Sequence, residues 1–252
     1  GLLMEKALEL GAEYVATGHY ARTKYDRENR RYVLARGVDR EKDQSYMLFL
    51  LSQDKLKHAV FPLGGYLKKE VRKIAHGSNL NVFDREESQE ICFVKDGDCA
   101  GFVSERMSRK RNPGPIVDTG GNILGEHNGI HNYTVGQRKG IGINMGHPLY
   151  VVRIDAKKNT IVVGMENALY SSQLRACPVN WVSMPPPDKP FRSFARIRYK
   201  HEEADCVVTP LNGGAVRVRF DDPQRAVTPG QAVVFYDGET VTGGGWILPD
   251  SG

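Results

Sequence analysis

The sequence predicts an α/β domain, a small β-rich domain and a C-terminal β-barrel, in that order along the chain. Residues 2–10 carry apolar side chains at helical spacing and lead through Gly11 into the short apolar segment 14–17, the pattern of a helix followed by a buried strand. From Pro113 onward glycines become frequent and helix-forming residues rare. From Pro178 onward about six short β-rich segments recur between turn residues, which is typical of a small closed barrel.

We expect three domains, with boundaries near residues 110 and 170. One helix and one strand cannot make a doubly wound sheet, so we expect the parallel sheet of the α/β domain to begin before Gly1. The alternative, a small complete domain that starts at Gly1, leaves the strand at Tyr14 without parallel neighbours. The expected domains are residues 1–110, 111–170 and 171–252.

The composition is that of an ordinary soluble protein. The chain has 252 residues, 40% of them hydrophobic and 26% charged, and no apolar run long enough to span a bilayer. Its first residues lack the features of a signal peptide, so we expect a cytoplasmic location and no membrane partner. Four scattered cysteines without a Cys-x-x-Cys pair predict neither a disulfide scaffold nor a structural metal. A net charge of +5 and a pI of about 9.0 permit a polyanionic partner without requiring one.

Two elements follow the first strand. Residues 20–24 and 31–36 flank a polar tip and predict a β-hairpin. The apolar run 46–51 predicts a helix, for which Asp43 is a natural N-cap. The free N–H groups of such a helix start also suit a phosphate group.

The next segments predict two more helices and the first strands of the middle domain. Apolar residues from 67 to 75 share one helical face, and Gly77 should end this helix. A further helix is expected from Cys99 to Met107. Tyr150–Ile154 and Thr160–Val163 predict a hairpin in the middle domain.

One barrel segment, residues 194–200, carries an alternating basic pattern. Arg196, Arg198 and Lys200 alternate with apolar residues, so a regular strand would place three positive charges on one face. Such a stripe is either an ordinary solvated face or a surface for a nucleic-acid backbone, and charge alone leaves these two interpretations balanced.

Cys92 is the candidate reactive residue. It lies between Ile91 and Phe93, near the expected seam between the α/β and β-rich regions, where clefts form. A free thiol with apolar neighbours is most often a packed hydrophobe, and the alternative is a nucleophile. We interpret Cys99 as structural. His19 is a weaker candidate, because it follows the first strand at the end where parallel sheets bind ligands.

Six motifs follow one another along the chain: Ala16-Thr17-Gly18-His19-Tyr20-Ala21, Lys42-Asp43-Gln44-Ser45-Tyr46, Phe61-Pro62-Leu63-Gly64, Ser88-Gln89-Glu90-Ile91-Cys92-Phe93, Thr134-Val135-Gly136-Gln137-Arg138-Lys139-Gly140 and Thr228-Pro229-Gly230-Gln231-Ala232. In this order the chain resembles the bacterial tRNA-specific 2-thiouridylase family, from the middle of its catalytic domain to its C-terminus. The resemblance implies part of an adenine-nucleotide-hydrolase-like ATP pyrophosphatase domain, a central β domain and a tRNA-binding barrel.

The resemblance also implies ATP-dependent sulfur transfer to the 2-position of the wobble uridine of tRNA. In the family, ATP with Mg²⁺ activates the uracil 2-oxygen as an adenylate, and a cysteine persulfide, loaded by a sulfur-relay donor protein, delivers sulfur as AMP leaves. Cys92 matches the persulfide cysteine, and Gly18 matches a backbone contact to ATP. The positions that match tRNA contacts are His19, Lys42, Asp43, Gln44, Arg198, Tyr199 and Gln231.

Two parts of the family pattern are absent from the 252 residues. The pyrophosphatase loop Ser-Gly-Gly-Val-Asp-Ser is missing, and Gly37-Val38-Asp39 does not replace it. In the family a second cysteine, upstream of residue 1 here, resolves the persulfide by forming a disulfide with the position of Cys92. Cys99 is not its equivalent. We therefore expect a fragment that keeps the persulfide cysteine and most tRNA-contacting segments but is inactive alone.

Two other classes of function stay open. An RNA-binding module would use the basic stripe of the barrel and leave Cys92 packed, with no chemistry. An unrelated ATP-dependent ligase would need an ATP loop, and none is recognisable in the sequence. Within the resemblance, a regular strand would separate Arg198 and Tyr199 onto opposite faces, so if both contact tRNA they should lie at a strand end or a bulge.

Overall fold

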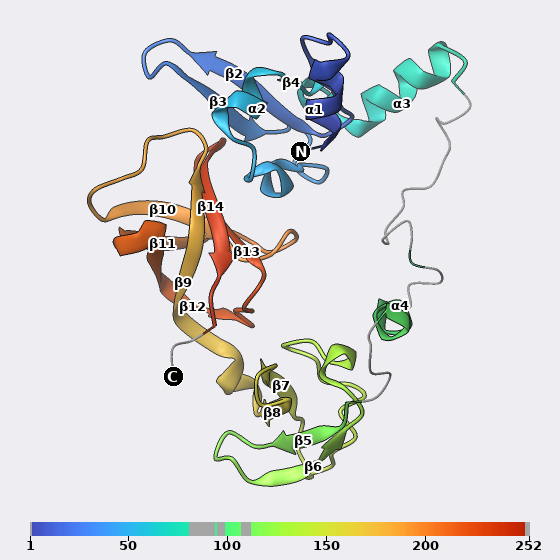
Figure 1. The fold of residues 1–252 in the computed structure, drawn as a ribbon, viewed down its shortest axis with the longest axis vertical. Helices are drawn as coiled ribbons and strands as arrows, with labels where there is room; N and C mark the ends of the chain where they lie inside the picture. The colour runs from blue at the N-terminus through green and yellow to red at the C-terminus, as the bar shows by residue number, and fades with distance from the viewer. Residues whose placement is uncertain (1, 81–93, 95–98, 107–111, 250–252) are drawn as a thin grey trace. The chain divides into compact units, whose positions relative to one another are not determined.

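The structure is a computed structural model whose chain divides into two compact units (Figure 1). Unit 1 contains residues 1–85, 172–222 and 229–252, and unit 2 contains residues 86–171 and 223–228. The N-terminal α/β region and most of the C-terminal strands therefore belong to the same unit. The residues that the structure describes are 2–80, 94, 99–106 and 112–249.

The N-terminal part of unit 1 contains the predicted first strand, in a parallel pair that the sequence does not predict. Helix α1 (Leu2–Glu9) leads into strand β1 (Val15–Ala16), as predicted. Strand β1 pairs in parallel with β4 (Ala59–Val60), with Val15 opposite Ala59. Strand β4 is not anticipated from the sequence, because two residues are too few to show a strand period.

Short helices connect the strands of this region, and one differs from the sequence-based expectation. The apolar run expected to form a helix over 46–51 forms only a 3₁₀ turn, and Asp43 is not its cap, because Gln44 holds that position and makes no side-chain cap bond. The carboxylate of Asp43 is engaged by other donors instead. The helix ending at Gly77 is confirmed. The helices are η1 (Ser45–Leu48), α2 (Gln53–Lys57), η2 (Pro62–Gly65) and α3 (Lys68–Gly77).

Six strands among the described residues close into the expected C-terminal barrel (Figure 1). Their order around the barrel is β13-β10-β11-β12-β9-β14, and pairing between β13 and β14 closes the circle. The strands are β9 (Tyr170–Trp181), β10 (Phe191–Arg196), β11 (Ala204–Pro210), β12 (Val216–Arg225), β13 (Ala232–Asp237) and β14 (Thr240–Ile247), with a 3₁₀ turn η6 (Asn212–Gly214) between β11 and β12.

Strand β10 is shorter than the basic pattern predicts. It ends at Arg196, and residues 197–200 form a bend and a turn. The predicted stripe of Arg196, Arg198 and Lys200 on one strand face is therefore wrong, because alternation between faces requires an unbroken strand.

The α/β region and the barrel share a sheet and a core. Strands β2 (Ala21–Asp26) and β3 (Arg31–Arg36) form the predicted hairpin, and β3 also pairs with barrel strand β14, with Leu34 opposite Val241. Nothing in the local sequence pattern indicates this long-range pairing. The shared core contains Ala21, Leu34, Tyr46, Leu48, Phe49, Leu56, Val182, Ala232, Val234, Tyr236 and Val241.

Unit 2 is a small β-rich body with the predicted hairpin. Its sheet has the order β6-β5-β8-β7, in which β7 and β8 pair antiparallel and β5 and β8 pair in parallel. Its core contains Ile116, Ile141, Leu149, Val151, Ile161 and Val163. The elements are α4 (Cys99–Arg106), β5 (Gly114–Val117), β6 (Ile123–His127), η4 (Ile130–Asn132), β7 (Tyr150–Asp155), β8 (Thr160–Gly164) and η5 (Glu166–Leu169). No helix in the described part of the chain is long and apolar enough to cross a membrane.

Candidate functional site

Gly18 and His19 lie where the backbone leaves the carboxyl end of β1. Gly18 is exposed, and a β-carbon built there would meet only Leu63 Cδ1 at 3.7 Å, so its backbone is open to a ligand. His19 is half-buried, with Nδ1 2.8 Å from the hydroxyl of Thr17 and its ring edge-on to Phe61 at a centroid distance of 6.0 Å. These contacts fix the orientation of the imidazole.

The next residue, Tyr20, ties this strand end to the loop before η1. Its backbone N–H donates to Gln44 Oε1 at 3.0 Å, and its carbonyl accepts from the backbone N–H of Gln44 at 2.9 Å. His19 and Gln44, which are 25 positions apart in the sequence, are therefore held on adjoining segments. The structure brings these two predicted contact positions together.

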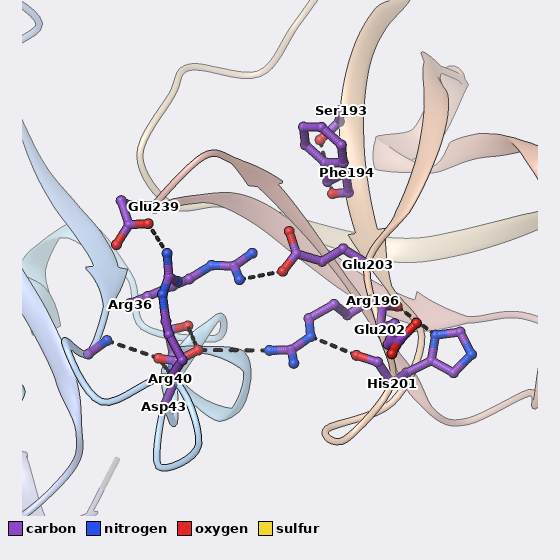
Figure 2. A network of polar contacts seen from close by, with 12 residues as sticks. Arg36, Arg40, Asp43, Ser193, Phe194, Arg196, His201, Glu202, Glu203 and Glu239 are labelled. Atoms are coloured by element: carbon purple, nitrogen blue, oxygen red, sulfur yellow. Dashed lines mark hydrogen bonds and ion pairs between the residues drawn. The ribbon is translucent and has the colours of Figure 1, made fainter. Parts of the chain in front are cut away.

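Asp43 is buried beside Gln44, with an exposed fraction of 5%. Its Oδ1 accepts from the backbone N–H groups of Gly37 (3.0 Å) and Ser45 (3.1 Å), and its Oδ2 accepts from the Ser45 hydroxyl at 2.9 Å. The guanidinium of Arg196, at the end of barrel strand β10, lies 3.8 Å from Oδ2 (Figure 2). The carboxylate thus joins the loop to the barrel.

Further ion pairs reinforce this junction. Arg36, at the end of β3, pairs with Glu203 before β11 (Figure 2). The Arg36 guanidinium also lies over the Tyr236 ring, 4.0 Å from its centroid. Arg40 pairs with Glu239 in the turn between β13 and β14. Both bridges connect the α/β region to the barrel within unit 1, and neither was found by sequence reasoning, because charges far apart in the sequence carry no pairing signal.

Tyr46 connects the loop to two more of the predicted contact positions. Its hydroxyl donates to the carbonyl of Ala232 at 2.9 Å, directly after Gln231, and its ring lies 6.1 Å from that of Tyr199. Burial raises the pKa of Tyr46 to about 12. Gln231 is exposed, whereas Tyr199 is half-buried.

Arg198 and Tyr199 lie in the bend and turn after β10 rather than within the strand. The alternation that would separate them onto two faces therefore does not apply. The nearby His201 has its Nδ1 2.8 Å from the carbonyl of Glu202, and burial lowers the pKa of the His201 imidazole.

Unit 1 thus assembles most of the predicted site residues from segments far apart in the sequence. Lys42 is half-buried in the same loop as Asp43 and Gln44. The sequence does not identify Tyr46 as the residue that connects this loop to the barrel. The only indication in the sequence is a single hydroxyl within the apolar run 46–51. Cys92 and its motif, residues 88–93, lie outside the described residues. In the described part of the chain, no group of three or more His, Cys, Asp or Glu side chains is arranged to hold a metal ion.

Three family models match successive parts of the chain. The tRNA methyl transferase HUP domain matches residues 1–96, the tRNA methyl transferase PRC-barrel domain matches residues 100–165, and the aminomethyltransferase beta-barrel domain matches residues 171–247. Together with the observed parallel strand pair and closed barrel, they define a HUP-domain protein with a β-rich middle and a C-terminal barrel.

Curated relatives specify the family. The chain is 52% identical over 245 residues to the tRNA-specific 2-thiouridylase MnmA of Acetivibrio thermocellus. The aligned region covers 97% of this chain and 68% of that protein. The chain is 48% identical over 245 residues to the MnmA of Halothermothrix orenii (97% and 68%) and 50% identical over 246 residues to that of Geotalea uraniireducens (98% and 65%). The chain belongs to the tRNA-specific 2-thiouridylase family.

Proposed function

We propose that this chain acts in a tRNA-uridine 2-sulfurtransferase, where it binds tRNA and delivers sulfur to the 2-position of the wobble uridine. The observation that carries the proposal is the 52% identity, over 97% of the chain, to a relative named as a tRNA-specific 2-thiouridylase. The assembly of the expected tRNA contacts in unit 1 supports it. We place the activity in the cytoplasm.

The tRNA contacts would be made by residues at the junction of the α/β region and the barrel. Lys42 and Arg198 supply positive charge for the phosphate backbone. Tyr199 supplies an aromatic ring on which an unpaired base can stack. The remaining contacts are assigned to His19, Gln44 and Gln231.

ATP, with Mg²⁺, is the proposed co-substrate, and it would convert the uridine 2-oxygen into a leaving group. Among the described residues, the exposed backbone of Gly18 at the carboxyl end of β1 fits a contact to ATP, because ligands of open parallel sheets bind at that end.

Cys92 is the proposed sulfur carrier, loaded as a persulfide by a sulfur-relay donor protein. Its terminal sulfur forms the bond to uridine C2 as the oxygen departs with AMP. A second thiol then attacks the Cys92 sulfur, which releases the thiolated base and leaves a disulfide. The electron pair of the broken S–S bond leaves with the sulfur on the base, and the attacking thiolate supplies the pair that forms the new disulfide.

We further propose that the 252 residues alone form no product, because they contain no Ser-Gly-Gly-Val-Asp-Ser loop. The test joins this chain to the N-terminal segment of the Acetivibrio relative and measures 2-thiouridine in tRNA, with ATP, Mg²⁺ and a protein persulfide donor, because free sulfide can attack the activated uridine without a carrier. The joined protein and its Cys99→Ser variant should form product, whereas Cys92→Ser and the 252-residue chain should not. Full activity of Cys92→Ser would overturn the assignment of the carrier.

Thiol labelling separates this proposal from an RNA-binding module without chemistry. A sulfur carrier must be reached by its donor, so Cys92 should react with iodoacetamide in the folded protein. Cys206 provides the matched control, because it is fully buried and burial raises the pKa of its thiol to about 12. A Cys92 that reacts as slowly as Cys206 would favour the binding module.

A further inference from the structure

We propose that Asp43 and Arg196 form a positioning pair that holds the loop carrying Lys42 and Gln44 in its tRNA-binding conformation, and that neither side chain contacts tRNA. The inference rests on the proposed function, because it concerns how that tRNA surface is built. The inference gives Asp43 a different role from its two sequence neighbours, Lys42 and Gln44, which are proposed to contact tRNA, although all three belong to one short motif.

The hydrogen bonds of Asp43 leave it little capacity for a ligand. Three donors from Gly37 and Ser45 occupy its two oxygens at 2.9–3.1 Å, and the guanidinium of Arg196 lies 3.8 Å from Oδ2. Its side chain is only 3% exposed. A buried carboxylate cannot approach a polyanion without losing these partners and adding repulsion. Contact between Asp43 and tRNA therefore conflicts with the packing.

Arg196 is directed into the same junction. Its Nε donates to the carbonyl of His201 at 2.9 Å, and its guanidinium lies 6.0 Å from the centroid of the Tyr236 ring. Only 18% of its side chain is exposed. Arg196 therefore connects β10 to the Asp43 loop inside unit 1. It is not placed to bind phosphate, as the expected basic stripe on an outward strand face would have required.

The pair determines where the flanking residues point. Asp43 Oδ1 accepts hydrogen bonds from Gly37 and Ser45, which lie at the two ends of the loop. The carboxylate therefore holds the two ends of the loop together. A β-carbon at Gly37 would lie 2.9 Å from the carbonyl oxygen of Tyr20, so the start of the loop is packed against the same residue that binds Gln44. Loosening Asp43 would let Lys42 and Gln44 leave this geometry together.

The test measures tRNA binding by the 252-residue chain across a range of salt concentrations. Asp43→Asn and Arg196→Gln should each raise the apparent Kd on the order of tenfold, because only the fraction of chains with an ordered loop binds. The double variant should lose less affinity than the sum of the two single losses, since both substitutions break the same contact between Asp43 and Arg196. Asp188→Asn, the same chemical change on an exposed loop residue, should leave the Kd unchanged.

Salt dependence distinguishes positioning from contact. Removing a cation that binds phosphate lowers the slope of log Kd against log salt by about 0.7 to 0.9. Lys42→Gln should show this loss, whereas Arg196→Gln should keep the wild-type slope. Ser45→Ala removes a single donor to Asp43, so it should weaken binding less and without loss of slope, and it decides the matter if Asp43→Asn fails to fold.

Several results would overturn the inference. Wild-type affinity in Asp43→Asn, additive losses in the double variant, or a reduced slope in Arg196→Gln would each show that the pair does not act by holding the loop. Absence of tRNA binding by the wild-type chain would overturn the proposed function and this inference together. The two failures are distinguishable, because the first three results leave wild-type binding intact.

Discussion

Removal of the Tyr46 hydroxyl should destabilise unit 1 by an amount that shrinks at alkaline pH. Tyr46 is 4% exposed, and its hydroxyl donates to the Ala232 carbonyl at 2.9 Å across the junction of the α/β region and the barrel. Burial raises the pKa of Tyr46 to about 12. Tyr46→Phe keeps the aromatic ring but removes both the hydrogen bond and the titrating group.

The magnitude follows from two opposing effects. At pH 7 the variant lacks one buried hydrogen bond, which costs about 1 kcal/mol of unfolding free energy. In the unfolded wild type Tyr46 ionises near pH 10, whereas in the folded protein it keeps its proton to about pH 12. The wild type therefore loses stability between these values, by about 1.4 kcal/mol at pH 11, one pKa unit above the unfolded value. The variant has no such loss, so the penalty should vanish between pH 10 and pH 11, and at pH 11 the variant should be the more stable protein by about 0.4 kcal/mol.

Urea unfolding of both proteins from pH 7 to pH 11 provides the assay. Both tryptophans of the chain, Trp181 and Trp246, lie in unit 1, so their fluorescence reports on this unit. Groups that titrate at high pH without interacting with Tyr46 are present in both proteins and cancel in the difference. A difference in unfolding free energy that stays constant over this range would refute the reasoning.

Three further substitutions or reactions have defined outcomes. Gly64→Ala should destabilise unit 1 by more than about 2 kcal/mol in urea unfolding, because a β-carbon would lie 1.7 Å from a backbone carbonyl oxygen of β2, and a wild-type midpoint would contradict this packing. His127→Ala should lower the melting temperature of unit 2 in calorimetry, because the buried ring accepts a bond from the Gly129 N–H at 3.0 Å, and His127→Gln should lower it less. Iodoacetamide at pH 8 should modify the half-buried Cys177 faster than the fully buried Cys206 by mass spectrometry, and equal rates would contradict the burial.

The order of architectures along the chain could be predicted because it is recorded in local patterns. The β2–β3 and β7–β8 hairpins follow from β-rich runs around polar turns. The closed barrel follows from the recurrence of short strands. These elements depend on neighbours close in sequence, which periodicity and turn residues describe.

The junction between the α/β region and the barrel could not be predicted, because it depends on long-range packing. Phe49 packs against β14, where a β-carbon at Gly244 would lie 2.7 Å from the Phe49 ring, and no local pattern pairs these positions. The same junction ends β10 at Arg196, which is held by the His201 carbonyl, and so breaks the alternation expected of a longer strand. Asp43 was misread as a helix cap because its true partner, Arg196, is distant in the sequence.

In the candidate site, too, the sequence indicates the residues, whereas their arrangement depends on long-range packing. The motifs identify Lys42 and Gln44 by type and order, and the resemblance assigns these two residues and Tyr199 to tRNA contact. Their spatial relation follows only from the structure, through Tyr46 and the bonds between Tyr20 and Gln44. A motif therefore indicates which residues matter, whereas burial decides which of them can meet a ligand.

Hydrogen exchange of the 252-residue chain with and without tRNA tests most directly the claim that segments of the α/β region and the barrel form one tRNA-binding surface. Bound tRNA should slow exchange both in residues 18–20 and 42–46 and in residues 196–201, because the contacts from Tyr46 to Tyr199 and from Asp43 to Arg196 hold these segments together. Slowed exchange in only one of the two regions, or in neither, would contradict a shared surface.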